Sequence, residues 1–339
     1  MAKPAHRYDF ASDNVAGAMP EAIAALGQAN EGFAAGYGAD HVSARAAELI
    51  RQLVDADAEV RFTASGTAAN ALTLAALAQP HEAVICHEHA HIATDETGAP
   101  GFFGAGVGLI TLPGAAGRID AAALAEVLGR PDVSFRQSPA ALSLTNATEY
   151  GAVYSEAALS ALIEPARRAG LRVHLDGARI SNAVAAGFPI RRLAALGVDA
   201  AILGGTKAGS TPSEAIMLFD KALARRFDAR MKHAGQLVSK GRYLAAPWIG
   251  MLETGAWTTR AAHANAMAKK LAALMPFPVA HPVEANGVFA TIDEAAFGRL
   301  RRQGWQVYRF IDGTVRFMCS WATTEAAVEE LGAALKASV

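Results

Sequence analysis

Short apolar runs alternate with helical patterns between about residues 60 and 220 of the 339-residue chain, and this alternation limits the fold more than any other feature. The apolar runs lie at 60–62, 83–86, 109–112, 142–144, 171–175 and 200–203. Strands joined by helices predict a largely parallel sheet with helices on both faces. Residues 216–219 follow the last run after only a short loop, which favours one additional antiparallel strand.

The C-terminal part of the chain predicts a second, smaller domain. Prolines at 276, 278 and 282 precede a strand at 288–292, a helix at 294–303, strands at 306–310 and 314–319, and a helix at 324–336. The chain is also longer than the size at which a single hydrophobic core stops growing. We therefore expect a large α/β domain with an N-terminal arm over residues 1–245, and a small α+β domain over residues 246–339.

The charge of the chain is nearly balanced. Its formal net charge is −1 and its isoelectric point about 6.8, so we expect neither a nucleic-acid nor a membrane partner. No apolar run approaches the roughly 18 residues of a membrane span, and the N-terminus lacks an apolar core of signal-peptide length. Cys86 and Cys319 lie far apart in sequence, which favours a reduced, cytoplasmic setting.

A lysine and an aspartate follow two of the apolar runs. Lys207 comes after the run 200–203 and the segment Gly204-Gly205-Thr206, while Asp176 ends the run that begins at residue 171. The stretch between them has room for one helix. A lysine held at the end of a buried strand is better interpreted as positioned for chemistry than as a solvated charge. Pyridoxal 5'-phosphate (PLP) needs such a pair, an amine that bonds its aldehyde carbon and a carboxylate that pairs with its pyridinium nitrogen.

Ser65-Gly66-Thr67 stands where a predicted strand gives way to a helix. Hydroxyls and free N–H groups at a helix N-terminus suit a phosphate, although an ordinary serine cap is the commoner explanation when the segment is taken alone. The glycines at 204–209 and 104–108 lack the spacing of nucleotide-binding loops, which argues against a nicotinamide-dependent oxidoreductase.

Three histidines, His87, His89 and His91, are spaced so that they can share one face of a strand and bind a metal. The run follows a strand end, however, and the spacing reveals no second cluster of ligands. We expect no metal; instead, one histidine stacks on a flat cofactor ring while the others are solvated or hydrogen-bonded.

Two arginines have surroundings that suit carboxylate binding. Arg179 follows Asp176 in an Asp-Gly-Ala-Arg turn, and Arg316 lies in a predicted apolar strand, facing away from Phe317 and Cys319. A planar guanidinium can hold a carboxylate through two N–H groups. A structural ion pair is the alternative for each arginine.

Taken in order, six elements resemble the threonine aldolases: Ser12-Asp13-Asn14, Ser65 to Asn70, His91-Ile92, Asp176 to Arg179, Gly204 to Lys207, and Arg316. That family has the aspartate-aminotransferase-like fold of fold type I PLP enzymes, and the resemblance covers nearly the whole chain. Residues 234–240 resemble the branch of low-specificity L-threonine aldolases and phenylserine aldolases.

The resemblance implies roles for these residues. Lys207 would carry PLP, Asp176 would pair with the ring nitrogen, and His91 and Ala178 would lie against opposite ring faces. The phosphate would be held by Ser65, Gly66, Thr67 and Thr206. The carboxylate of the amino-acid substrate would be held by Ser12, Arg179 and Arg316.

The activity implied by the resemblance is cleavage of L-3-hydroxy amino acids (threonine, allo-threonine, phenylserine) to glycine and an aldehyde. Lys207, Asp176 and His91 would be the catalytic residues, with His91 as the base for the β-hydroxyl proton. One departure stands out, because Thr148 occupies the position of a histidine that helps a familiar branch of the family to recognise the β-hydroxyl. Another PLP lyase that catalyses β-elimination, or a non-catalytic PLP-binding protein, are the alternatives.

The resemblance also implies an oligomer. Enzymes of this fold typically build each site at a dimer interface, so we expect a homodimer or homotetramer. Tyr37, in the segment Gly36-Tyr37-Gly38, would lie near the neighbouring site, with a glycine-rich turn as the alternative.

Overall fold

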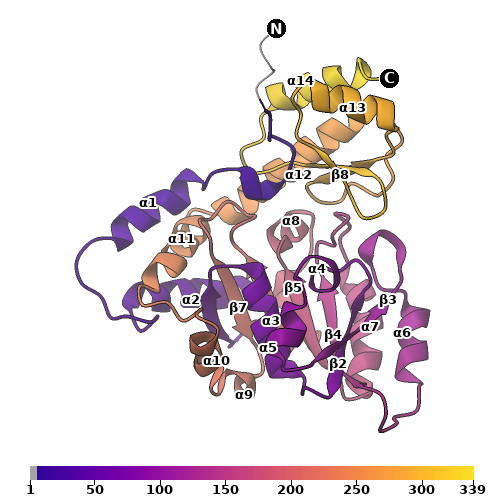
Figure 1. The fold of residues 1–339 in the computed structure, drawn as a ribbon. Coiled ribbons are helices and arrows are strands. Elements are labelled where there is room, and N and C mark those ends of the chain that lie inside the picture. Colours follow the sequence, from indigo (N-terminus) through magenta and orange to yellow (C-terminus); the bar gives the residue numbers. More distant parts are fainter. Residues whose placement is uncertain (1–5) are drawn as a thin grey trace.

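The computed structural model describes residues 6–339; the first five residues of the expected arm lie outside that part. Figure 1 shows a large sheet flanked by helices and a smaller domain that contains the C-terminus. The large sheet has the strand order β1-β7-β6-β5-β4-β2-β3. Its strands are β1 Glu59–Thr63, β2 Glu82–His87, β3 Gly108–Leu112, β4 Ser138–Thr145, β5 Arg172–Gly177, β6 Ala200–Gly204 and β7 Glu214–Leu218.

The directions of the strands confirm the predicted sheet. Strands β3, β2, β4, β5 and β6 run parallel to one another, and β7 pairs antiparallel with both β6 and β1. The antiparallel direction of β7 follows from its short connection to β6, since a parallel neighbour needs a long crossover. The predicted additional strand at 216–219 is therefore confirmed, two residues earlier at its start than expected.

Helices cover both faces of the large sheet, as predicted (Figure 1). Alternate residues of β6 belong to different hydrophobic clusters, Ala200 and Ile202 to one and Ala201 and Leu203 to the other. A strand that is covered on both faces has a continuous apolar sequence, which explains why β6 could be predicted. The helices of this part are α1 Pro20–Ala29, α2 His41–Val54, α3 Gly66–Leu77, α4 His91–Thr94, α5 Ala99–Phe103, α6 Ala121–Leu128, α7 Glu156–Arg168, α8 Ile180–Ala185, α9 Lys221–Ala224, α10 Phe227–His233 and α11 Arg242–Glu253.

The small domain is built on a three-stranded antiparallel sheet with the order β8-β10-β9. Its elements are β8 Gly287–Ala290, α13 Glu294–Arg302, β9 Tyr308–Arg309, β10 Val315–Met318 and α14 Glu325–Lys336. These elements follow the predicted order, although β9 is shorter than the expected strand at 306–310. No helix in residues 6–339 combines the length and the apolar character needed to cross a membrane.

The long helix α12, Ala256–Leu274, joins the two domains (Figure 1). Its first residues and all of α11 pack with the large domain, where Trp248 and Trp257 are almost completely buried. Met267 and Leu271, farther along α12, pack in the small-domain core instead. The packing therefore favours a boundary within α12, later than the predicted one between residues 245 and 246.

The N-terminal segment also differs from the expected arm of the large domain. Phe10 is buried in the small-domain core, and the Arg7 backbone pairs with Gly304 and Gln306. The next element is the short helix η1 (Asp13–Val15). Its first residue, Asp13, forms an ion pair with Arg179, which lies just after β5. Residues 7–13 thus tie the two domains together.

Candidate active site

A cavity of about 380 Å³ lies between the large and the small domain. Its walls bring together five of the residues singled out in the sequence: Ser12, His91, Arg179, Lys207 and Arg316. The remaining lining residues are Asn14, Asp95, Glu149, Tyr308, Arg309, Phe310 and Ile311. Residues that are far apart in the chain therefore converge on one space, as the resemblance implied.

Asp176 is buried in β5, beside this cavity. Its carboxylate accepts a hydrogen bond from Asn70 Nδ2 at 2.9 Å and another from the Ala178 amide at 2.9 Å. His174 lies two residues earlier in the strand, and burial keeps its pKa well below the ordinary value, so this neighbour is neutral. Two donors thus fix the position of a carboxylate that still has lone pairs for a further donor.

His91 begins α4 and is connected to Asp176 by a chain of hydrogen bonds. Its Nδ1 lies 2.9 Å from Oε1 of the buried Glu96, and that oxygen also accepts from Asn70 Nδ2 at 2.8 Å. The hydrogen bond to Glu96 raises the pKa of His91, while burial raises the pKa of Glu96 itself. Because Nδ1 is occupied, Nε2 is the ring nitrogen free to handle a proton.

Lys207 follows β6 after two glycines that pack unusually close to their neighbours. A Cβ at Gly204 would collide with the Ala178 carbonyl, and one at Gly205 with the Ser213 carbonyl. Without side chains, the end of β6 can approach the turn that follows Asp176, so the segments that carry Lys207 and Asp176 pack against each other. The sequence signal of two glycines before the lysine is therefore explained by packing.

Glu214 lies buried beneath the Lys207 turn. Its Oε2 accepts a hydrogen bond from the Gly205 amide at 2.8 Å, and burial raises its pKa to about 7. Thr206 Oγ1 accepts from the Ser213 amide at 3.1 Å. Glu214 was not predicted from the sequence, because a glutamate next to a strand normally has a solvent-exposed side chain.

Ser65, Gly66 and Thr67 form the N-terminus of α3. Ser65 Oγ accepts from the Ala68 amide at 3.2 Å, so its hydroxyl caps the helix, which is the commoner of the two explanations given above. Nothing lies within 4 Å of the place that a Cβ of Gly66 would take. The first N–H groups of a helix have no partner inside it. Apart from the Ala68 amide, which Ser65 Oγ caps, those of α3 are suited to a phosphate.

The two arginines differ in how far they are already paired. Arg179 donates to Asp13 from Nε at 2.7 Å and from Nη2 at 3.0 Å, which is the structural ion pair considered as the alternative. Arg316 lies over the rings of Tyr308 and Phe310, and its buried Nε has no hydrogen-bond partner within residues 6–339. Burial lowers the pKa of Arg316. Arg316 is therefore the better placed of the two to take a carboxylate.

Thr148 does not line the cavity, although the resemblance put it at a substrate-recognition position. Its hydroxyl is buried, donates to the Ala116 carbonyl at 2.8 Å and accepts from the Ala152 amide at 3.1 Å. The next residue, Glu149, takes the place on the cavity wall.

The three histidines point to different partners. His87 Nε2 lies 3.0 Å from the Gly114 carbonyl, and His89 Nδ1 lies 2.6 Å from the Tyr150 hydroxyl. His91 belongs to the Glu96 chain described above. In the described part of the chain, no three histidine, cysteine or acidic side chains lie together as metal ligands would.

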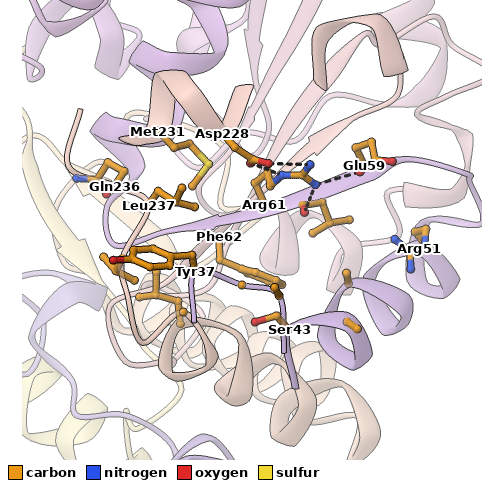
Figure 2. A pocket seen from close by; sticks show the side chains of 18 residues that line it. Tyr37, Ser43, Arg51, Glu59, Arg61, Phe62, Asp228, Met231, Gln236 and Leu237 are labelled. Atoms are coloured by element: carbon orange, nitrogen blue, oxygen red, sulfur yellow. Dashed lines mark hydrogen bonds and ion pairs between the residues drawn. The ribbon is translucent and has the colours of Figure 1, made fainter. Parts of the chain in front are cut away.

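A second cavity, of about 430 Å³, lies at the β1 edge of the large sheet and contains none of the predicted site residues. Figure 2 shows Arg61 paired with Asp228 and Glu59 in this cavity, with Tyr37 on its opposite side. The Lys232 ammonium lies 4.5 Å from the centre of the Tyr37 ring. The convergence of reactive side chains singles out the cavity between the domains instead.

The residues around that cavity fit PLP. Lys207 supplies an amine, Asp176 a fixed carboxylate, the start of α3 open N–H groups, and Arg316 a buried Nε without a partner within residues 6–339. Asn70 and Glu96 are additions that sequence reasoning missed. The one available signal was a polar residue, Asn70, inside an otherwise apolar helix.

Comparisons with known proteins agree with this geometry. Residues 9–295 match the beta-eliminating lyase family. The low specificity L-threonine aldolase of Pseudomonas sp. (strain NCIMB 10558) is 46% identical over 336 residues, covering 97% of each chain. The threonine aldolase structure from Leishmania major matches with a TM-score of 0.92 and 29% identity, covering 98% of this chain and 99% of that one.

More distant structures support the fold alone. A serine palmitoyltransferase from S. paucimobilis with bound PLP matches with a TM-score of 0.68 at 16% identity, covering 98% of this chain and 86% of that one. The recognition of a fold type I PLP enzyme from the sequence is thereby confirmed. With a family match over most of its length and a near full-length relative at 46% identity, the chain belongs to the beta-eliminating lyase family, and within it to the threonine aldolases.

Proposed function

We propose that this protein cleaves L-3-hydroxy amino acids, L-threonine among them, to glycine and an aldehyde. The observation that carries the proposal is one cavity in which Lys207 and His91 of the large domain face Arg316 of the small domain. Within residues 6–339, the buried Nε of Arg316 has no hydrogen-bond partner. The family is PLP-dependent, and the near full-length relative is a low specificity L-threonine aldolase.

Three groups would hold the cofactor. Lys207 would carry it through its amine, Asp176 would keep a proton on the ring nitrogen, and the start of α3 would hold the phosphate. PLP, when bound, supplies an electron sink for the pair of electrons released when a bond to Cα breaks. The hydrogen bonds from Asn70 and Ala178 would hold the Asp176 carboxylate in position to pair with the ring nitrogen.

The substrate carboxylate would be held by Arg316, together with Ser12 and the remaining edge of Arg179. Two N–H groups of a guanidinium fix a carboxylate in orientation as well as position. Arg179 already commits its Nε hydrogen and one Nη2 hydrogen to Asp13, so three of its five N–H groups are left for a ligand. Arg316 Nε, by contrast, has no hydrogen-bond partner within residues 6–339. We therefore propose that Arg316 makes the main contact with the substrate carboxylate.

His91 would take the proton of the β-hydroxyl. Its Nδ1 is bonded to Glu96, so the ring is held in one orientation and Nε2 acts as the proton acceptor. As the hydroxyl loses its proton, the aldehyde C=O forms and the Cα–Cβ bond breaks. The ring would also lie against the face of the cofactor, the role that the resemblance implies.

We also propose a homodimer or homotetramer with sites at the dimer interface. The segment 31–39 is exposed almost throughout, and Phe33 is fully exposed within it. A second subunit that covered Phe33 would remove its apolar surface from water, which stabilises the assembly. Tyr37 would then lie near the neighbouring site, and the molar mass in solution, measured by light scattering, tests the assembly.

The function is tested with purified protein loaded with PLP. We expect acetaldehyde from L-threonine and L-allo-threonine, benzaldehyde from phenylserine, and glycine from all three. Accumulation of a 2-oxo acid and ammonia without glycine would favour the β-elimination alternative. Lys207→Ala is expected to lose the borohydride-reducible cofactor adduct, and an unchanged rate in that variant would refute the scheme.

A further inference from the structure

Glu149 is a carboxylate on the cavity wall that has no assigned role. It follows β4, and its side chain is only 10% exposed. No side chain or amide within residues 6–339 donates a hydrogen bond to it. The nearest cationic atom, Arg179 Nη1, lies 3.8 Å away, which is beyond hydrogen-bond distance.

The surroundings explain why this carboxylate is left without a donor. The Nε and Nη2 atoms of Arg179 are committed to Asp13, so the guanidinium cannot turn toward Glu149 without giving up that pair. Across the cavity, the charge of Glu149 acts on both His91 and Arg316. A largely buried carboxylate with unused lone pairs, surrounded by the groups that bind substrate, is ready to accept a hydrogen bond from a ligand.

The chemistry of the substrate identifies the donor, if the proposed function holds. A 3-hydroxy amino acid offers a carboxylate, an amine and a hydroxyl. Glu149 would repel the carboxylate and Arg316 would attract it, while the amine would be bound at the cofactor held by Lys207. The β-hydroxyl is the one remaining donor.

Neighbouring groups are less suited to this hydroxyl. Thr148 is buried and uses its hydroxyl within the protein, as described above. Asp95, the other carboxylate of the cavity wall, is exposed and already accepts a hydrogen bond from Thr94 Oγ1 at 2.8 Å. We propose that Glu149 accepts a hydrogen bond from the substrate β-hydroxyl and so selects 3-hydroxy amino acids over those that lack the hydroxyl.

The test compares two variants and two ligands that differ only at the β-carbon. Glu149→Leu removes the acceptor at similar size, and Glu149→Gln keeps a neutral acceptor oxygen. L-2-Aminobutyrate is L-threonine without its hydroxyl, and its dissociation constant is measured from the cofactor absorbance, as is that of glycine. Asp95→Asn removes the same charge from the same wall and serves as the matched control.

We expect Glu149→Leu to lower kcat/KM for L-threonine by about 10- to 100-fold, the range for a hydrogen bond to a charged group. Glu149→Gln should lose less than Glu149→Leu, and Asp95→Asn should change little. The dissociation constants of glycine and L-2-aminobutyrate should stay within about threefold of wild type, because neither ligand has a hydroxyl to lose.

Two outcomes would overturn the inference. A parallel loss of glycine affinity in Glu149→Leu would mean that Glu149 acts through Arg179 on the substrate carboxylate. An unchanged kcat/KM for L-threonine would mean that it has no part in recognition. Failure of the proposed function has a different signature, since the wild-type protein would then bind glycine but release no aldehyde.

Discussion

Arg179 donates two hydrogen bonds to the buried carboxylate of Asp13, from Nε at 2.7 Å and from Nη2 at 3.0 Å. Asn286 of the small domain donates a third hydrogen bond to the same carboxylate, at 3.1 Å. The pair therefore joins the N-terminal segment to the end of β5 and to the small domain. It also decides how much of Arg179 is left for a substrate, since two of its five N–H groups are committed to Asp13.

Replacement of Asp13 by Asn should be strongly destabilising. The change removes the carboxylate that is hydrogen-bonded to the buried Arg179 guanidinium, and the loss of one partner of a buried ion pair typically costs about 3–5 kcal/mol. Urea unfolding of the two proteins measures the difference. Glu253→Gln is the matched control, because it breaks the exposed Arg45–Glu253 pair, which has a 2.7 Å contact and is worth about 0–1 kcal/mol. Equal effects of the two changes would contradict the prediction.

The same pair should make stability depend on pH. Burial alone would raise the pKa of Asp13, but Arg179 overcomes this and lowers it from 3.8 to about 2. A carboxylate with a depressed pKa in the folded state contributes stability that is present above its unfolded pKa and is lost as the pH falls through the folded one. The free-energy difference between wild type and Asp13→Asn should therefore shrink by about 2 kcal/mol between about pH 5 and pH 2. A constant difference across that range would rule out this origin.

Arg316 should be required for carboxylate binding in a way that lysine cannot replace. Arg316→Lys keeps the charge but loses the planar pair of donors, so we expect the dissociation constant of glycine to rise by about 10- to 100-fold. Cofactor absorbance during a glycine titration measures it. Arg309→Lys is the comparison, because Arg309 lines the same cavity but is already bonded to Glu294 and to the Gly313 carbonyl. A wild-type glycine affinity in Arg316→Lys would refute the proposed role of Arg316 in binding the substrate carboxylate.

Much of the fold could be predicted because its strands are buried on both faces. A strand such as β6 has to be apolar throughout, and that run, the two glycines and the lysine that follow are visible in the sequence without any tertiary information. The boundary between the two domains is harder to predict from the sequence. In the sequence, Trp248 and Trp257 resemble core residues of either domain. The boundary between residues 245 and 246 therefore stays a prediction, and the packing of both tryptophans in the large-domain core favours one within α12.

The candidate site was predictable in part for the same reason. Asp176 and Lys207 follow long apolar runs, with glycines beside them, and this combination marked them as positioned residues. Glu96 and Glu214 could not be recognised as site residues, because a glutamate in a loop or at the end of a strand usually has a solvent-exposed side chain. Their burial depends on tertiary packing. Glu149 was not singled out because the resemblance drew attention to Thr148, and a shift of one residue decides which side chain lines the cavity.

The chain from His91 through Glu96 to Asn70 and Asp176 should control the pH dependence of the reaction. The hydrogen bond to Glu96 raises the pKa of His91, and a base has to be neutral to take a proton. Glu96→Gln removes the charge that stabilises the protonated ring, so the pKa of His91 should fall. The acidic limb of the kcat/KM profile for L-threonine should then move to lower pH, while glycine affinity at neutral pH stays near that of wild type. His91→Asn, in which no ring titrates, should lose that limb altogether. If the limb keeps its wild-type position in both variants, His91 is not the base and its part is confined to packing against the cofactor.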